Sequence, residues 1–178
     1  MKTISITKQE DIPQKYINTP IEELLLYHNF KMPFKEYNHA KLLIGMCMDY
    51  RKELTIPRNF AYIIRSAGAN LKHLEFNVSY AIAIGGIKYI LLLSHNNCGM
   101  VDLMSKKEKF IDGLITNANW SRENAEEHFM NCVSMFEIKN EEQFVLDETE
   151  EFKKKYDGIT VVPAHYQIED NMIYLLEK

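Results

Sequence analysis

The chain is short of cysteine, of repeats and of linker-like segments, and each shortage excludes a kind of protein. Its 178 residues include only three cysteines. A small, odd number of cysteines argues against a disulfide framework and indicates a reducing compartment, so we expect a cytoplasmic protein. The sequence has no internal repeat, low-complexity stretch or convincing linker. Residues 1–178 are therefore expected to form a single domain, which is long enough to bury a substantial core.

Long apolar runs and an excess of positive charge are also missing. No apolar stretch approaches the ~18 residues of a membrane span, and residues 1–10 lack the apolar core of a signal peptide. The net charge is −4. The one basic cluster, at 153–155, follows three glutamates and is typical of a solvated helix face. We therefore expect neither a nucleic-acid partner nor a membrane partner.

What the chain does contain is an alternation of short apolar runs and amphipathic segments. The runs at 41–47, 61–65 and 89–94 predict buried strands, and the pattern at 71–85 predicts a helix that ends at Gly85-Gly86. A helix between two strands predicts a right-handed crossover within a parallel sheet. The expected class is α/β, with a central, mostly parallel sheet flanked by helices.

The remaining elements complete this organisation. Further helices are predicted at 20–30, after the N-cap residue Ser121, and from the N-cap residue Asn140 to Tyr156. Late strands are predicted at 159–162 and 172–176. The domain accordingly divides into three parts: an N-terminal helical arm at 1–40, a metal-site core at 41–104, and a helical region with C-terminal strands at 105–178.

Three residues near the ends of predicted strands are candidate metal ligands. Cys47 ends the first core strand, His95 ends the third, and Cys98 follows three residues later. Because ligand sites of open α/β sheets gather at the carboxyl ends of strands, we expect these residues to converge. Two thiolates and an imidazole suit Zn²⁺, and a catalytic zinc typically keeps three protein ligands and one open position. The sequence predicts about one Zn²⁺ per chain at Cys47, His95 and Cys98.

Two charged residues follow the first ligand closely. Asp49 and Arg51 stand two and four residues after Cys47, where a carboxylate and its guanidinium partner could govern the open metal position. The alternative interpretation is a surface ion pair worth ~0–1 kcal/mol. Cys132 lies in an apolar stripe of its predicted helix and is interpreted as a small buried hydrophobe.

The motifs C-x-D-x-R at 47–51 and H-x-x-C-G at 95–99 resemble those of the β-class carbonic anhydrases. Between them, residues 64–70 are similar to the family stretch V-R-N-A-G-N, and residues 79–90 to its S-L-E-Y-A-V-x-x-L-G-V-K-x-I segment. The resemblance covers about residues 41–104. It departs from the family in three places: a segment of only 13 residues between Arg51 and Arg65, Ser66 in place of Asn, and Asn96 in place of Ser or Thr.

The resemblance implies an enzyme that hydrates carbon dioxide reversibly to bicarbonate by zinc-bound hydroxide. In such a site Asp49 orients the hydroxide, and Arg51 holds Asp49 off the metal through a bidentate pair. The backbone at Gly68 borders the substrate, and His73 is a candidate proton relay. The resemblance also implies a homodimer or a higher even oligomer, with the N-terminal arm around the partner subunit.

Two alternatives remain open at the level of sequence. The substrate could be a relative of CO₂, such as COS or CS₂, whose carbon is attacked by the same nucleophile. Alternatively, the protein could be non-catalytic and stabilised by zinc. Such a closed structural site needs a fourth ligand, which Asp49 or Cys132 would have to supply.

Overall fold

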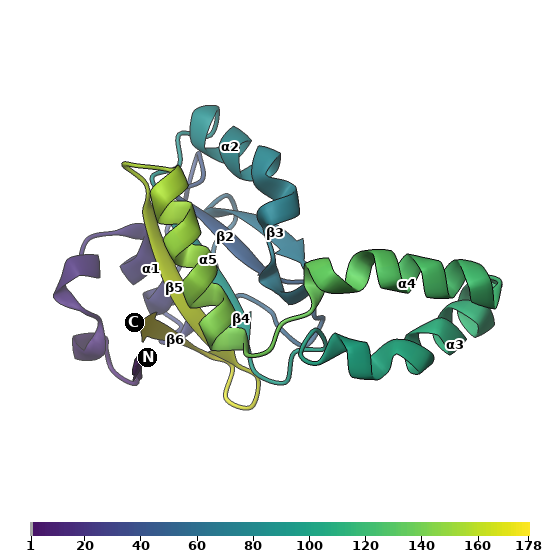
Figure 1. Cartoon of the computed structure of the whole chain (residues 1–178). Helices are drawn as coiled ribbons and strands as arrows, with labels where there is room; N and C mark the ends of the chain where they lie inside the picture. Colours follow the sequence, from purple (N-terminus) through teal and green to yellow (C-terminus); the bar gives the residue numbers. More distant parts are fainter. Residues whose placement is uncertain (1) are drawn as a thin grey trace.

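A six-stranded sheet organises the computed structural model, which describes residues 2–178 (Figure 1). The strand order is β1-β6-β5-β4-β2-β3; the four strands from β5 to β3 run parallel, and the β1-β6-β5 edge is antiparallel. The expected α/β class, with a mostly parallel sheet in one domain, is confirmed. The strands are β1 (Lys2–Ile4), β2 (Leu42–Cys47), β3 (Ala61–Ser66), β4 (Tyr89–His95), β5 (Thr160–Gln167) and β6 (Met172–Glu177).

Helices cover both faces of this sheet, which explains why its central strands are continuous apolar runs. All six residues of β2 are buried. Its alternate side chains enter two separate cores: Ile44 packs with helix α1 on one face, and Leu43 packs with helices α2 and α5 on the other. The α-helices are α1 (Pro20–His28), α2 (Glu75–Ala83), α3 (Lys107–Ala118), α4 (Arg122–Phe136) and α5 (Glu141–Lys155). Short 3₁₀ helices are η1 (Gln9–Asp11), η2 (Gln14–Tyr16), η3 (Ala67–Ala69), η4 (Lys72–Leu74) and η5 (Leu103–Lys106).

The N-terminal segment packs against its own chain. Helix α1 begins after the N-cap Thr19, whose hydroxyl accepts a hydrogen bond from the Ile21 amide. Its apolar residues Leu24, Leu25 and Tyr27 lie in the core beside the sheet. The apolar residues of this segment had also suggested more apolar surface than a short helix can bury on its own chain, but these three side chains are fully buried there. The amphipathic face of α1 covers one side of the sheet, and these three side chains are not available to a partner subunit.

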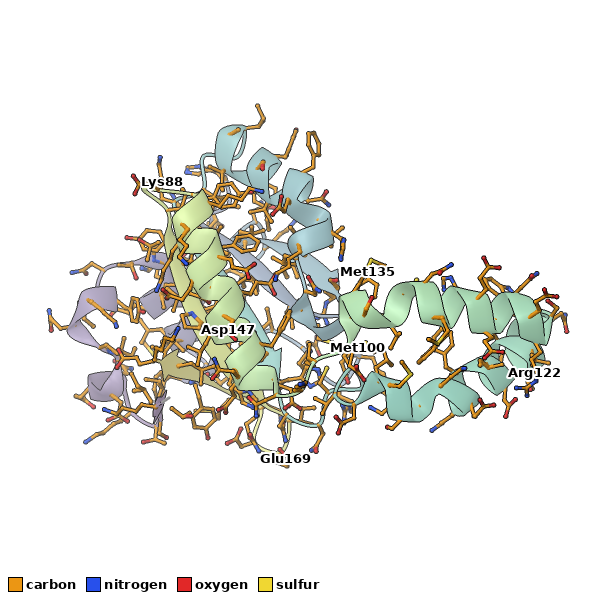
Figure 2. The ribbon with its side chains drawn as sticks, viewed as in Figure 1. Lys88, Met100, Arg122, Met135, Asp147 and Glu169 are labelled. Atoms are coloured by element: carbon orange, nitrogen blue, oxygen red, sulfur yellow. The ribbon has the colours of Figure 1, made fainter. Side chains whose placement is uncertain are left out.

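Helices α3 and α4 form an antiparallel hairpin that projects away from the sheet (Figure 1). Figure 2 places Arg122 at its far end, and Met100 and Met135 where it joins the body. The sequence predicted α4 and α5, and Ser121 and Asn140 cap them as expected, through the amides of Asn124 and Gln143. Helix α3 and strand β1 were not predicted. Helix α3 does carry a short apolar stripe, at Phe110, Ile111, Leu114 and Ile115, of which Ile111 is fully buried.

Within residues 2–178, no helix combines the length and the apolar character needed to cross a bilayer.

Candidate metal centre

Three buried ligand side chains meet at the carboxyl edge of the sheet. Cys47 is the last residue of β2 and His95 the last residue of β4, and these two strands are adjacent and parallel. Cys98 follows in the loop after β4. The Cys47 and Cys98 sulfur atoms are 3.9 Å apart, and the three potential ligand atoms lie within 4.8 Å of one another. The structure therefore brings together the three ligands that the sequence singled out.

The donor atoms of this cluster fit a zinc ion. His95 Nδ1 lies 2.9 Å from the Asn96 carbonyl oxygen, a contact that favours a proton on Nδ1 and a free lone pair on Nε2. Within residues 2–178, His95 Nε2 is fully buried and has no hydrogen-bond partner. A buried polar atom without a partner is costly, and a metal ion would satisfy it. Two sulfur donors and this nitrogen form a set that suits Zn²⁺.

The two thiols influence each other directly. A hydrogen bond from Cys98 lowers the pKa of the Cys47 thiol, and the same contact raises the pKa of Cys98. The two sulfur atoms therefore share a proton, and the pair readily holds one thiolate. Thiolate is the form of cysteine that binds metals.

The Asp49 carboxylate lies beside this cluster and is held by Arg51. Arg51 Nε donates to Asp49 Oδ1 at 3.0 Å and Nη2 donates to Oδ2 at 2.6 Å, while the Arg51 backbone amide donates to Oδ1 at 2.9 Å. These hydrogen bonds hold the pKa of Asp49 well below its usual range. Asp49 Oδ2 is 4.0 Å from His95 Nε2. This forked pair faces a candidate metal ligand, unlike an isolated surface ion pair.

Four hydrogen bonds and a buried lysine in this region were not expected from the sequence. Arg51 Nη2 also donates to the Asn97 carbonyl oxygen at 2.9 Å. Arg65, from β3, donates to the carbonyl oxygens of Cys47 and Asp49 at 3.4 Å, and to that of Lys52 at 3.2 Å. Lys52 is itself 2% exposed, and burial lowers its pKa to about 8. The R-S-A-G stretch pointed to Arg65, whereas a single lysine in a loop gives no such signal.

Gly68 and the residues after it form a wall beside the ligands. Gly68 has φ 64°, and a Cβ at this position would lie 3.4 Å from Met100 side-chain atoms. The left-handed conformation favours glycine, whereas the Met100 distance is an ordinary van der Waals contact. The loop is tied to the body further on, because the Leu71 amide donates to Glu148 Oε1 at 2.8 Å. Burial raises the pKa of the Glu148 carboxyl to about 7.

Two residues named from the sequence lie outside the cluster. His73 is exposed on η4, where its ring packs 5.8 Å from that of Phe136. Cys132 is half-buried on α4, with its sulfur 4.0 Å from His128 Nδ1. It borders a cavity of about 330 Å³ at the foot of the hairpin. The expectation that Cys132 is fully buried is therefore wrong. Cys132 is not part of the cluster and does not supply a fourth ligand there.

A family comparison agrees with this site. The model of the carbonic anhydrase family matches residues 45–172, well over half of the chain. The matched region contains Cys47, Asp49, Arg51, His95 and Cys98. The chain therefore belongs to the carbonic anhydrase family, in its β class.

Solved structures with the same fold include the carbonic anhydrase of Streptococcus mutans, at 16% identity and TM-score 0.61 over 93% of this chain and 100% of that one. The β-carbonic anhydrase isoform I of Trichomonas vaginalis is 16% identical, with TM-score 0.64 over 91% of this chain and 96% of that one. The apo form of a carbon disulfide hydrolase is 18% identical, with TM-score 0.54 over 90% of each chain. At these identities the likeness establishes the fold. No curated protein sequence gives a significant match.

Proposed function

We propose that this protein catalyses the reversible hydration of carbon dioxide to bicarbonate, with one Zn²⁺ per chain held by Cys47, His95 and Cys98. The observation that carries the proposal is the Asp49 carboxylate, fixed by Arg51 with its Oδ2 atom 4.0 Å from His95 Nε2. Bound Zn²⁺ supplies a Lewis acid that lets water act as a nucleophile near neutral pH. Two thiolates offset the metal charge, so the orientation of that water matters more here than beside neutral ligands.

Asp49 supplies this orientation. An ionised carboxylate only accepts hydrogen bonds, so Asp49 Oδ2 can hold the proton of the attacking water and direct an oxygen lone pair toward the carbon of CO₂. Arg51 keeps this carboxylate ionised and prevents it from rotating, through the two side-chain contacts and the backbone contact described above. Without Arg51, Asp49 would be free to act as a fourth ligand and close the site.

The surroundings of the ligands suit an uncharged substrate. Cys47 and Cys98 pack with buried Ile138, and the side chains of Met100 and Val101 cover this group. An apolar neighbourhood disfavours charged and strongly hydrated molecules, because such molecules would lose their hydration there. The backbone at Gly68, which leaves room that a side chain would fill, contributes to the same wall.

The decisive experiment is stopped-flow CO₂ hydration by protein of verified zinc content. We expect wild-type activity that rises with pH, and a loss of at least about 10²-fold in Asp49→Asn with zinc retained. Asp147→Asn is the matched control, because Asp147 is exposed on α5 and bonds only a neighbouring glutamine side chain. Zinc-loaded wild-type protein without activity above buffer, or full activity in Asp49→Asn, would overturn the proposal.

A second candidate reaction is hydrolysis of COS or CS₂. The structural likeness to a carbon disulfide hydrolase favours testing it, because the same nucleophile attacks the carbon of these molecules. Sulfide release from COS or CS₂, measured on the same preparations, separates the two reactions. A kcat/KM for CS₂ above that for CO₂ would identify CS₂ hydrolysis as the main reaction of this protein.

We also propose a homodimer that is joined through β3 and α2. Strand β3 is an edge of the sheet, and unpaired edges associate readily when apolar side chains surround them. Large exposed apolar side chains gather on these elements, an arrangement that marks interaction surfaces. They are Tyr62 (40% exposed), Ile63 (45%), Phe76 (79%) and Tyr80 (52%), with Ile84 (71%) directly after α2.

Analytical ultracentrifugation at micromolar concentration tests this surface. We expect a mass of at least twice the 20.9 kDa chain, and a folded monomer in Phe76→Glu. Phe34→Glu is the control, since Phe34 is also exposed but belongs to the N-terminal segment. Dimers lost in Phe34→Glu and kept in Phe76→Glu would place the interface on the N-terminal segment.

For the cellular compartment we propose the reducing cytoplasm, in line with three free cysteines. Cell fractionation tests this proposal.

A further inference from the structure

The loop between His95 and Cys98 is fastened to a distant hairpin. Asn96 Oδ1 accepts a hydrogen bond from the Ile168 amide at 2.9 Å. Asn96 Nδ2 donates to both carboxylate oxygens of Glu169, at 2.9 and 2.7 Å. Ile168 and Glu169 lie in the turn between β5 and β6, and Figure 2 places Glu169 at the edge of the molecule. The Asn that replaces the usual Ser or Thr after the ligand histidine therefore holds the ligand loop on this turn.

The next residue links this turn to the Asp49–Arg51 pair. Asn97 adopts φ 55° in the left-handed region, and its Nδ2 donates to Glu169 Oε1 at 3.3 Å. Its carbonyl oxygen accepts from Arg51 Nη2 at 2.9 Å. That same nitrogen donates to Asp49 Oδ2 at 2.6 Å. The Arg51 Nη2 atom therefore has two acceptors, Asp49 Oδ2 and the Asn97 carbonyl oxygen, and only the first belongs to Asp49.

We propose that Glu169 is a positioning residue for the Asp49–Arg51 pair. Its carboxylate holds the Asn96 and Asn97 side chains, thereby fixes the Asn97 carbonyl oxygen, and through that oxygen fixes Arg51 Nη2. Asp49 then receives a guanidinium whose direction is already set. The kinetic consequence rests on the proposed CO₂ hydration, whereas the structural consequence for Arg51 does not. Glu169 touches neither a candidate metal ligand nor the proposed substrate position.

The arrangement around Glu169 differs from an ordinary surface carboxylate. Its oxygens accept from three neutral amide groups, those of Asn96, Asn97 and Gln167, the last at 2.7 Å. These donors are side chains of the folded protein and not mobile ions from solution. Several hydrogen bonds to one carboxylate fix its orientation. The adjacent Asp170 serves the turn itself, because it accepts from the Met172 amide at 2.8 Å and from the Tyr174 hydroxyl at 2.5 Å. Local turn stability and the link to the ligand loop are thus carried by different residues.

The first test compares Glu169→Ala with Asp170→Ala, which loosens the same turn without touching Asn96 or Asn97. In Glu169→Ala we expect the ¹⁵N–¹H signals of the Arg51 guanidinium to broaden and exchange faster with water, while zinc content stays unchanged. In the proposed reaction we expect kcat to fall about tenfold. Asp170→Ala should leave the Arg51 signals as in the wild type. Unchanged Arg51 signals in Glu169→Ala, or equal changes in both variants, would overturn the proposal.

The second test is a double-mutant cycle with Arg51→Ala. If Glu169 acts through Arg51, Glu169→Ala should cause no further loss of activity in the Arg51→Ala background. If the two residues act independently, the fold-losses of the two single variants should multiply in the double variant. Multiplied losses would overturn the positioning role. A wild-type protein without hydration activity would refute the proposed function but not this inference, because the guanidinium signals are read without turnover.

Discussion

Two carboxylates, Asp49 at the carboxyl edge of the sheet and Glu148 on the buried face of α5, experience opposite environments. Asp49 accepts three hydrogen bonds of good geometry from Arg51, and its pKa lies below the usual range. Glu148 accepts one bond, from the Leu71 amide, and burial raises its pKa to about 7. Among residues 2–178, Glu148 Oε2 has no partner. A fixed cation keeps a carboxylate charged, whereas a single amide does not offset the cost of burial.

The difference separates a chemical role from a structural one. Asp49 stays ionised over the whole range of physiological pH, as an orienting hydrogen-bond acceptor requires. Glu148 anchors Leu71, and Leu71 packs over Gly45 in the centre of the sheet. The following substitutions test this contrast, first through effects on metal and activity and then through smaller effects on stability.

The largest effect is expected from removal of the metal beside Asp49. Cys47→Ser and Cys98→Ser should each lose tightly bound zinc and all hydration activity, because a serine hydroxyl is a poor substitute for thiolate. Cys132→Ser is the control and should keep both, since Cys132 lies outside the cluster. Elemental analysis with stopped-flow assays measures this. Full zinc content in both ligand variants would exclude the assigned site.

Removal of the cation from Asp49 should have the next largest effect. Arg51→Ala leaves Asp49 free to rotate, so we expect kcat/KM for CO₂ to fall about 10²-fold, the cost of a misplaced catalytic group. Zinc should be retained. Arg122→Ala, which breaks only exposed ion pairs of the hairpin, should leave activity unchanged. Equal rates in Arg51→Ala and wild type would show that the pair has no part in turnover.

Glu148→Gln should change the pH dependence of stability. The folded-state pKa of about 7 exceeds the ordinary value of 4.5, so the folded protein binds more protons than the unfolded chain between these values. Stability is therefore lost as pH rises from 4.5 to 7. The glutamine variant lacks this loss, and its stability relative to wild type should rise by about 3 kcal/mol between pH 4 and pH 8.

Urea unfolding at several pH values measures this difference. Glu150→Gln is the control, because Glu150 is only partly buried on the same helix and its hydrogen bond from Lys153 lowers its pKa, so this variant should lack the pH-dependent gain in stability. Parallel pH profiles for wild type and Glu148→Gln would contradict the assigned environment of the buried carboxyl.

Gly45→Ala tests the packing that Glu148 supports. A Cβ at this position would lie 2.4 Å from Leu71 Cδ1, so either Leu71 or the strand must move, at a cost of about 1–3 kcal/mol. Gly113→Ala in α3 meets nothing within 4 Å and should instead stabilise the protein by ~1 kcal/mol. Thermal unfolding compares the two variants. A neutral Gly45→Ala would mean that Leu71 is not tightly packed there.

The predicted elements succeed where the signal is local. The structure confirms β2, β4 and the two helices capped by Ser121 and Asn140. Each was predicted from residues that are close together in the sequence. Helix α3 was missed although Phe110, Ile111, Leu114 and Ile115 stand at helical spacing, because this apolar stripe is short and no side-chain N-cap precedes it. The contact between the N-terminal arm and a partner subunit stays a prediction; the structure shows only that Leu24, Leu25 and Tyr27 are buried in their own chain, because an apolar helix in sequence does not reveal which surface it covers.

By itself, the sequence determined the ligand types, their spacing along the chain and their position at strand ends, because motifs and strand periodicity depend on near neighbours. Parallel strands then require those ends to meet. Only the tertiary structure decided which groups complete the site. Arg51 reaches Asn97 across 46 residues, Asn96 reaches Glu169 across 73, and Glu148 reaches Leu71 across 77. Such hydrogen bonds depend on how loops and helices pack in space, and side-chain polarity alone does not specify a partner that far along the chain.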